Sequence, residues 1–100
     1  MHLWPFTHVR VAETSMQPTL QPGDRLIVLR WSRPRVGDLV VLRDPAFRSR
    51  LLVKRVAGRT ADGSYIVQAD NPNVGSDSRH LGPLAGDLLV GKVMWRYGGG

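Results

Sequence analysis

The sequence predicts an all-β domain. Its apolar runs are short, turn residues separate them at frequent intervals, and no segment keeps a helical spacing of apolar residues over several turns. A length of 100 residues, with 42% hydrophobic and 22% charged content, suits one small globular domain. We expect this domain to occupy residues 1–97, with residues 98–100 as a flexible glycine tail.

Turn residues bound each of the short runs that we interpret as strands. The first run ends before a proline-containing segment that permits only a short turn of helix. A Pro-Gly-Asp step introduces the second run, Gly-Asp steps introduce the third and the last, and an Asp-Pro step follows the third. The Asp-Gly step between the fourth and fifth runs is typical of a tight hairpin. The expected strands are Val9–Ala12, Arg25–Arg30, Asp38–Arg43, Leu51–Val56, Ser64–Gln68 and Leu88–Tyr97.

Lys54 lies in the middle of the apolar run LLVKRV. Because alternate residues of a strand share a face, Leu52 and Val56 should flank Lys54, and Arg55 should point to the opposite face. Lys54 and Lys92 are the only lysines among 14 basic residues, so arginine is the usual cation of this chain. Burial disfavours the ammonium, and a neutral lysine amine is a base that arginine cannot replace. The alternative is a lysine that extends from a sheet edge to water.

Ser15 lies in the segment TSMQPTL and is a candidate partner for this lysine. A serine hydroxyl becomes a good nucleophile when a base removes its proton. A neutral lysine amine is able to act as that base near neutral pH. The two residues together are candidates for a nucleophile and its general base.

The motifs around both residues resemble those of the type I signal peptidases. SMQPTL followed by Pro-Gly-Asp is similar to the nucleophile box of that family, and LVKRV is similar to its lysine box. Asp70-Asn71 and the run SDSR at 76–79 are similar to its two C-terminal boxes. The four boxes stand in the family's order and cover most of the chain. The resemblance implies a small, partly open, barrel-like β domain that cleaves peptide bonds with a Ser–Lys dyad.

The resemblance also implies roles for individual residues. Ser15 would be the nucleophile, with its backbone N–H as an oxyanion donor, and Lys54 would be the general base that later protonates the leaving amine. Met16 would shape the substrate site. The supporting residues would be Thr14, Asp70, Asn71, Ser76, Asp77, Ser78 and Arg79, with an ion pair between Asp77 and Arg79.

Two positions depart from the family's pattern. Glu13 stands where bacterial signal peptidases have a serine that donates to the oxyanion, and an ionised carboxylate only accepts hydrogen bonds. We therefore expect Glu13 to point away, and Thr14 or another donor to substitute, or the site to be weaker. Gly75 stands where the family often has a serine that contacts the lysine. Either Ser76 takes over this contact or the contact is lost.

The chain is short and arginine-rich, and no run approaches the ~18 apolar residues of a membrane span. In these respects it resembles the maturation proteases of nickel-type superoxide dismutase, a resemblance that includes GDLVV at 37–41, LLVKRVAG at 51–58 and GKVMWRY at 91–97. It implies removal of an N-terminal extension from a nickel superoxide dismutase precursor, without a cofactor, in the cytoplasm. The alternatives are processing of exported proteins, and membrane association if an anchor lies outside this chain.

Other catalytic chemistries find less support in the residues. A Ser–His–Asp triad would need His80, which lies in a polar loop without a triad motif. There is no cysteine, and the spacing of His2, His8 and His80 matches no usual zinc site, so no bound metal is expected. Self-cleaving repressors also use a Ser–Lys dyad on a related β fold, but no DNA-binding domain accompanies this one.

A binding module without catalysis is the other class of function considered. The net charge of +6 and the residues Trp4, Trp31 and Trp95 would suit nucleic acid or an acidic protein. The arginines are scattered and no RNA-binding signature is present, so a nucleic-acid partner is not expected. We expect Trp95 to lie in the core and the arginine-rich stretch 30–35 to be a solvated turn. The oligomeric state stays open.

Overall fold

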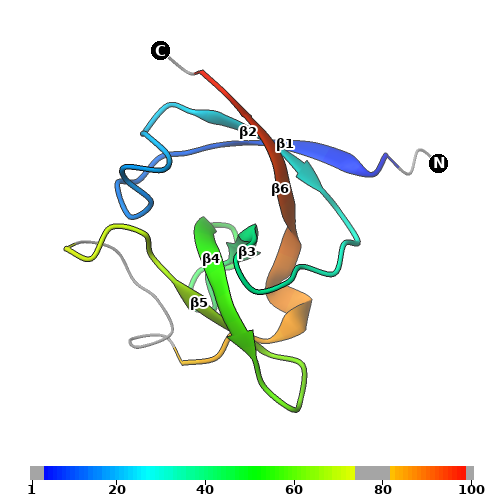
Figure 1. Cartoon of the computed structure of the whole chain (residues 1–100). Helices are drawn as coiled ribbons and strands as arrows, with labels where there is room; N and C mark the ends of the chain where they lie inside the picture. The colour runs from blue at the N-terminus through cyan, green and yellow to red at the C-terminus, as the bar shows by residue number, and fades with distance from the viewer. Residues whose placement is uncertain (1–3, 74–81, 99–100) are drawn as a thin grey trace.

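The computed structural model describes residues 4–73 and 82–98 of the chain. Its elements in chain order are β1 (Phe6–Arg10), β2 (Arg25–Leu29), β3 (Leu39–Arg43), β4 (Leu51–Arg59), β5 (Tyr65–Gln68), the short 3₁₀ turn η1 (Gly86–Leu88) and β6 (Leu89–Tyr97). All strand pairs are antiparallel and form one six-stranded sheet in the order β1-β2-β6-β3-β4-β5 (Figure 1). The described residues contain no α-helix, and the all-β prediction is confirmed.

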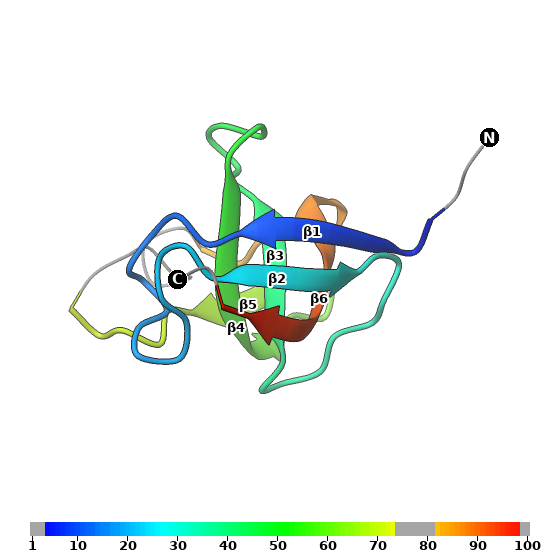
Figure 2. The same ribbon diagram turned by 90° about the horizontal axis from the view of Figure 1, so that it is seen from above.

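The sheet is coiled but does not close, because β1 and β5 remain the two ends of the strand order. β6 joins its two halves, since residues 92–97 pair with β2 and residues 89–92 pair with β3. Figure 2 shows β1 and β2 running across the direction of β3 and β4. The predicted partly open, barrel-like sheet is therefore confirmed.

Gly91 lies where the two halves of the sheet meet, opposite Val41 of β3. A β-carbon at this position would lie 2.3 Å from the carbonyl oxygen of Leu29 in β2. Register shifts occur on both sides of this crossing, between Ile27 and Val28 and between Val41 and Leu42. Glycine thus permits the close backbone approach by which β6 passes from one half of the sheet to the other.

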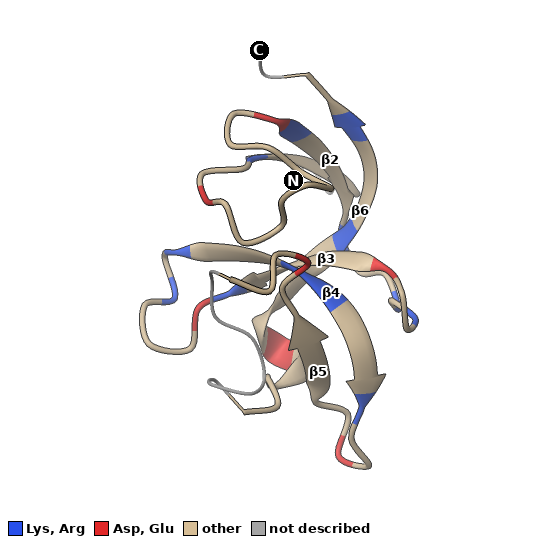
Figure 3. Ribbon diagram, turned by 60° about the vertical axis from the view of Figure 1, so that its left-hand side comes forward, with Lys and Arg blue, Asp and Glu red and all other residues tan. Residues whose placement is uncertain are grey.

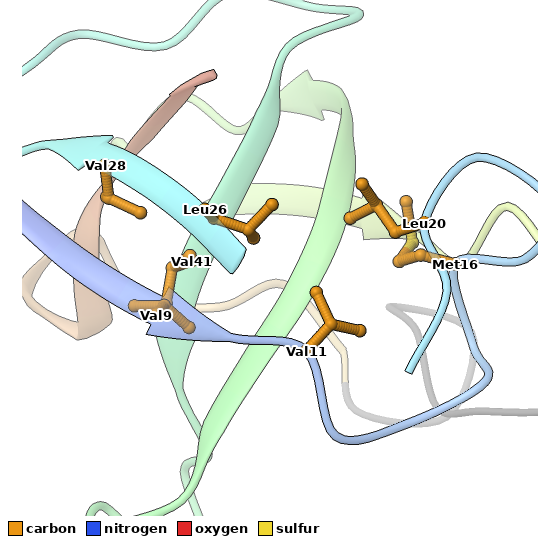
Figure 4. Packing of buried hydrophobic residues seen from close by; sticks show 7 residues of the cluster. All are labelled: Val9, Val11, Met16, Leu20, Leu26, Val28 and Val41. Carbon is orange, nitrogen blue, oxygen red and sulfur yellow. The ribbon is translucent and has the colours of Figure 1, made fainter. Parts of the chain in front are cut away.

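The core consists of two clusters of buried side chains, and β3 contributes to both. Val41 packs into cluster 1, whereas Val40 and Leu42 point to the opposite face and pack into cluster 2. Cluster 1 is drawn in Figure 4 and comprises Val9, Val11, Met16, Leu20, Leu26, Val28 and Val41. Cluster 2 comprises Val40, Leu42, Val56, Tyr65, Val67, Leu84 and Leu88.

The predicted strands are all present, with shifted ends. β1 begins earlier than predicted because its ladder with β2 starts at the pair Phe6 and Leu29. β6 begins after Leu88, which belongs to the 3₁₀ turn. The predicted hairpin joins β4 to β5, with the N–H of Thr60 donating to the carbonyl of Ser64 at 2.9 Å. Gly63 in this hairpin has a φ of +88°, a backbone conformation that glycine adopts without steric cost.

The placement of Trp95 in the core was wrong. Its side chain is 59% exposed and lies opposite Ile27 on β2, with its ring centroid 6.4 Å from that of Phe6. The last four residues of β6 are all exposed, because this end of the strand extends beyond the core. By contrast, the stretch 30–35 begins with a turn at residues 30–31 and continues as an irregular connection toward β3. Trp31 is 66% exposed, and the four other residues apart from the buried Pro34 are exposed or half-buried.

Charged residues are distributed over several strands and loops rather than gathered into one block (Figure 3). Of the predicted glycine tail, only Gly98 lies within the described residues. The part of the chain that the structure describes has no helix that is long and apolar enough to cross a membrane.

Candidate active site

Lys54 is buried in the middle of β4, with only 1% of its surface exposed. Leu52 and Val56, its neighbours on the same face, are 4% and 1% exposed, whereas Val53 and Arg55 are only partly buried. In the adjacent strand the residue opposite Lys54 is Val40, which is completely buried. The predicted alternation of β4 is confirmed, and the sheet-edge alternative is excluded by the burial of Lys54.

Ser15 lies in the connection between β1 and β2 and is 4% exposed. The base of this connection is closed by two backbone hydrogen bonds, from the N–H of Val11 to the carbonyl of Asp24 at 2.8 Å and from the N–H of Gly23 to the carbonyl of Val11 at 2.7 Å. Within it, the N–H of Leu20 donates to the carbonyl of Met16 at 2.9 Å. The segment after Ser15 forms a turn, and no helix is present among the described residues between β1 and β2.

Met16 and Leu20 attach the Ser15 loop, which is the connection between β1 and β2 at residues 11–24, to the body of the domain. Each is 1% exposed and belongs to cluster 1, as Figure 4 shows. Burying two large apolar side chains stabilises this arrangement by roughly 1.5–3 kcal/mol each. The loop that carries Ser15 is therefore anchored in the core at two points, while several of its other residues are exposed.

Asp70 and Asn71 connect the Ser15 loop to the strand that carries Lys54. Arg55, the residue after Lys54, donates from Nε and Nη2 to the two carboxylate oxygens of Asp70 at 2.8 and 2.7 Å. The backbone N–H of Asn71 donates to the carbonyl of Ser15 at 2.9 Å. Two consecutive residues thus bind the immediate neighbour of Lys54 on one side and Ser15 itself on the other.

Further contacts strengthen this connection. The Thr19 hydroxyl donates to Oδ2 of Asp70 at 2.5 Å, and the N–H of Asp70 lies 3.4 Å from Sδ of Met16. The side-chain amide of Asn71 donates to the carbonyl of Thr14 at 3.1 Å. Hydrogen bonds from Arg55 hold the pKa of Asp70 below its ordinary value, and partial burial opposes this shift.

Glu13 forms an ion pair with Arg50, which lies just before β4. Both side chains are on the surface, with exposed fractions of 38% for Glu13 and 54% for Arg50. Arg50 places a positive charge beside the Glu13 carboxylate, which occupies the position where the family has a hydrogen-bond donor. Arg50 is thus the neighbour that compensates the charge of Glu13.

A cavity of about 340 Å³, here called the Ser15 pocket, opens beside Ser15. Its walls come from the run His8–Glu13, from Ser15 and Met16, and from Arg50, Leu51 and Val53 at the start of β4. Lys54 does not line it, because Lys54 points to the other face of β4 from Val53. The pocket therefore offers a mainly apolar space to a ligand beside the hydroxyl, while the amine is kept from bulk water.

The remaining predicted site residues, Ser76, Asp77, Ser78 and Arg79, lie outside the described residues, as do Gly75, His2 and His80. Among the residues that are described, no group of three or more His, Asp or Glu side chains is placed to hold a metal ion.

Sequence reasoning missed Arg50, Arg55 and Thr19 as parts of the site. The signal for Arg55 was available in principle, because it pairs with Gln68 and Asp70 follows two residues later. The contacts of Thr19 and Arg50 depend on how irregular loops fold back, and no local pattern encodes them.

Comparisons with known proteins place these residues in a family context. Residues 1–63, which include Ser15 and Lys54, match the family described as signal peptidase, peptidase S26. The mitochondrial ATP-independent inner membrane protease subunit 1b of Arabidopsis thaliana is 31% identical, over 82% of this chain and 64% of its own length. The mitochondrial inner membrane protease subunit 2 of Schizosaccharomyces pombe is 30% identical, over 80% of this chain and 58% of its own.

A cyanobacterial relative, the "Probable signal peptidase I-1" of Synechocystis, is 25% identical over 87% of this chain and 68% of its own length. The chain thus spans about two thirds of the length of these relatives, or somewhat less. None of the three is a nickel-dismutase maturation protease, so the comparisons support the broad resemblance and not its finer form.

Proposed function

Because the chain belongs to the signal peptidase family, peptidase S26, we propose that it is a serine endopeptidase with Ser15 as nucleophile and Lys54 as general base. The observation that carries this proposal is the burial of a lysine at 1% exposure in an apolar strand, next to a serine loop tied to that strand. Removal from water disfavours the ammonium, and a neutral amine is what a general base requires.

The proposed reaction is acyl transfer. Lys54 takes the proton of the Ser15 hydroxyl as its oxygen attacks the scissile carbonyl carbon. The tetrahedral intermediate collapses with cleavage of the C–N bond, and Lys54 gives its proton to the leaving amine. Water, deprotonated by Lys54, then attacks the acyl carbon, and Lys54 returns this proton to the Ser15 oxygen as the bond between that oxygen and the acyl carbon breaks. The backbone N–H of Ser15 would donate to the oxyanion, a contribution that is worth ~2.7–4 kcal/mol in other hydrolases.

The substrate is proposed to bind as an extended strand in the Ser15 pocket. Among the described strands β1 pairs only with β2, and the start of β4 pairs only with β3, so each leaves one backbone edge unpaired. The pocket lies between residues 8–13, which are the end of β1 and the three residues after it, and residues 51–53 at the start of β4. A peptide that enters there is able to pair with backbone groups, and Val9, Val11 and Met16 would contact its side chains.

The substrate that we propose first is a precursor protein from which an N-terminal extension is removed, with the nickel superoxide dismutase precursor as the candidate. The motifs shared with that group of proteases support this choice. The second candidate is an exported or membrane-bound precursor, which is favoured by relatives that are named as inner membrane proteases and as a signal peptidase. These relatives also favour a membrane-associated location over a cytoplasmic one, and cell fractionation distinguishes the two.

The experiment is mass spectrometry of both classes of precursor after incubation with wild type, Ser15→Ala and Lys54→Ala. We expect a single N-terminal cut by wild type alone. Equal cleavage by wild type and Lys54→Ala would remove Lys54 from the mechanism. Unchanged precursors of both classes would contradict the proposed substrates.

A further inference from the structure

A second and larger cavity, of about 560 Å³, adjoins the Ser15 pocket. We call it the distal cavity. The two cavities share His8, Val9 and Leu51, so they lie next to each other along β1. From the shared residues the distal cavity extends away from Ser15, toward Thr7 on β1 and toward Leu89 and Val90 at the start of β6.

The charge of the distal cavity is positive. Arg30 and Arg43 line it, and none of the described residues that line it is acidic. The Ser15 pocket adds Arg10 and Arg50, and its one acidic residue among those described, Glu13, is paired with Arg50. A peptide that follows both cavities therefore meets arginine side chains along its path, and Arg50 is the one of them that is paired with Glu13.

Two acidic residues follow lining residues of the distal cavity in the sequence, Asp44 after Arg43 and the exposed Asp87 after Gly86, but neither lines the cavity itself. Asp44, which follows Arg43, is 8% exposed, and its Oδ1 accepts a hydrogen bond from the N–H of Ala46 at 2.8 Å. Arg43 uses Nη1 to donate to the carbonyl of Arg48 at 3.1 Å. A guanidinium has five N–H donors, so Arg43 keeps donors for a carboxylate after this bond is made.

Arg30 is held in place by an unusual turn. Trp31, the next residue, has a φ of +57°, a backbone conformation that a bulky side chain rarely adopts. The guanidinium of Arg30 lies over the Trp31 ring, 5.2 Å from its centroid. Ser32 secures the turn, because its hydroxyl donates to the carbonyl of Leu29 at 2.9 Å and accepts from the N–H of Lys92 at 3.1 Å. Backbone outliers of this kind are found where a site is preorganised.

We propose that the distal cavity is a substrate subsite that binds an acidic side chain of the precursor, several residues away from the scissile bond. The Arg30–Trp31 pair and Arg43 would hold the carboxylate, while Val9, Leu51 and Leu89 would pack against the peptide. Arginine suits this role because its planar fork matches a carboxylate in two hydrogen bonds. This inference rests on the proposed function, since it assigns a substrate class to the same peptide path.

The first test measures binding without cleavage. An alanine-based fluorescent peptide with several glutamates, and the same peptide with glutamines, are titrated against the Ser15→Ala chain at fixed salt. We expect the glutamate peptide to bind about tenfold more tightly, and the double variant Arg30→Gln/Arg43→Gln to lose this preference. The double variant Arg33→Gln/Arg35→Gln is the matched control, because it also removes two positive charges, from exposed residues outside both cavities. Equal binding of the two peptides would overturn the inference, and so would an equal loss in Arg33→Gln/Arg35→Gln.

The second test uses cleavage. In a precursor that wild type cuts, acidic residues on both sides of the cut, including those several residues away from it, are changed one at a time to the matching amide. We expect one such change to lower kcat/KM about tenfold for wild type and to have no effect for the double arginine variant. If no acidic position shows this coupling, the subsite is refuted while the protease stands. If the binding preference holds but wild type cuts no precursor, the proposed function fails and the cavity stands as an acidic-peptide site.

Discussion

Ser15 and Lys54 are both nearly inaccessible to solvent, but the two regions that hold them are built differently. Lys54 stands in a regular strand, where the ladder with β3 and the buried Leu52 and Val56 fix its position. Ser15 stands in an irregular loop, which is held by the apolar anchors on either side of its turn and by hydrogen bonds from Asn71. The lysine side is thus secured by many repeated contacts, and the serine side by a few specific ones.

This difference predicts that changes of Lys54 will affect chemistry far more than folding. Lys54→Met keeps the length and apolar stem of the side chain but removes the base, so kcat/KM should fall by about 10³-fold or more. The free energy of unfolding should change by less than about 2 kcal/mol, since the strand contacts remain. The assay is peptide cleavage with a thermal unfolding control.

Lys92→Met is the matched control for this variant. Lys92 is the other lysine of the chain, lies on β6, is about one third exposed and pairs with Asp38 at 3.4 Å. Its activity should stay near that of wild type. An active Lys54→Met, or a Lys92→Met that is equally inactive, would contradict the assignment of the base.

On the serine side, Asp70→Asn should lower both activity and stability. The variant weakens the bidentate hydrogen bond to Arg55, which helps to fix the position of the Ser15 loop relative to β4. Ser15 should then be positioned less accurately, and kcat should fall about tenfold. The Arg55 side chain is 35% exposed, so solvent screening limits the loss of stability to about 1 kcal/mol. Urea unfolding and single-turnover kinetics measure the two effects.

The stability difference between wild type and Asp70→Asn should depend on pH. The pKa of Asp70 is lowered in the folded protein, chiefly by hydrogen bonds from Arg55, so ionisation stabilises the fold above the ordinary aspartate pKa of about 3.9. The difference should be complete at neutral pH and disappear as the pH falls below about 4, through the lowered pKa. Asp38→Asn is the control: its pKa is also lowered, chiefly by the backbone N–H of Arg35, but it does not contact the Ser15 loop. It should show the pH effect and retain activity.

The two single variants of the Glu13–Arg50 ion pair should differ in their effect on activity. Arg50→Gln leaves an uncompensated carboxylate in the Ser15 pocket, which opposes a developing oxyanion, so kcat/KM should fall several-fold to about tenfold. Glu13→Gln removes that carboxylate and should stay within about threefold of wild type. The double variant should recover most of the loss in a double-mutant cycle. A double variant as impaired as Arg50→Gln would show that Glu13 is not the cause.

The smallest effect is expected for Asn71→Ala. The variant keeps the backbone N–H that binds the carbonyl of Ser15. It loses two side-chain hydrogen bonds, one donated to the carbonyl of Thr14 and one accepted from the N–H of Asn73. A hydrogen bond of this kind is worth about 0.5–1.5 kcal/mol, which corresponds to a two- to tenfold loss of kcat. Asn73→Ala, which keeps the N–H that Asn73 donates to Asn71, is the control and should be neutral. Loss of all activity in Asn71→Ala would mean that the amide acts in the chemistry itself.

The same contrast explains how far the sequence could predict the structure. The alternation around Lys54 and the Asp-Gly hairpin after β4 were readable because a strand repeats every two residues and a tight hairpin needs particular turn residues. Trp95 misled the prediction because an apolar strand does not reveal which end extends beyond the core. The contact between Arg55 and Asp70 joins residues that are distant in the chain, and it follows only once β4 and β5 are paired in the observed register.

The position of the Ser15 loop could not be predicted from the local sequence, for a further physical reason. Its position depends on where Met16 and Leu20 are buried, and cluster 1 is assembled from β1, β2, β3 and the loop itself. The motifs around Ser15 and Lys54 identified both residues as a candidate dyad, but not the neighbours that hold the serine in place. The positions of irregular segments depend on tertiary contacts, whereas strands are largely predicted by the alternation of apolar and polar residues in their own sequence.

The most direct test of the account is the dependence of kcat/KM on pH for wild type and Lys54→Met, from about pH 5 to 9. The account predicts that wild-type activity rises as one group loses a proton and then reaches a plateau, because only neutral Lys54 accepts the proton of Ser15. Lys54→Met should show only a low residual rate without this rise. A wild-type rate that is flat over the range while chemistry is limiting, or an identical rise in Lys54→Met, would contradict Lys54 as the general base.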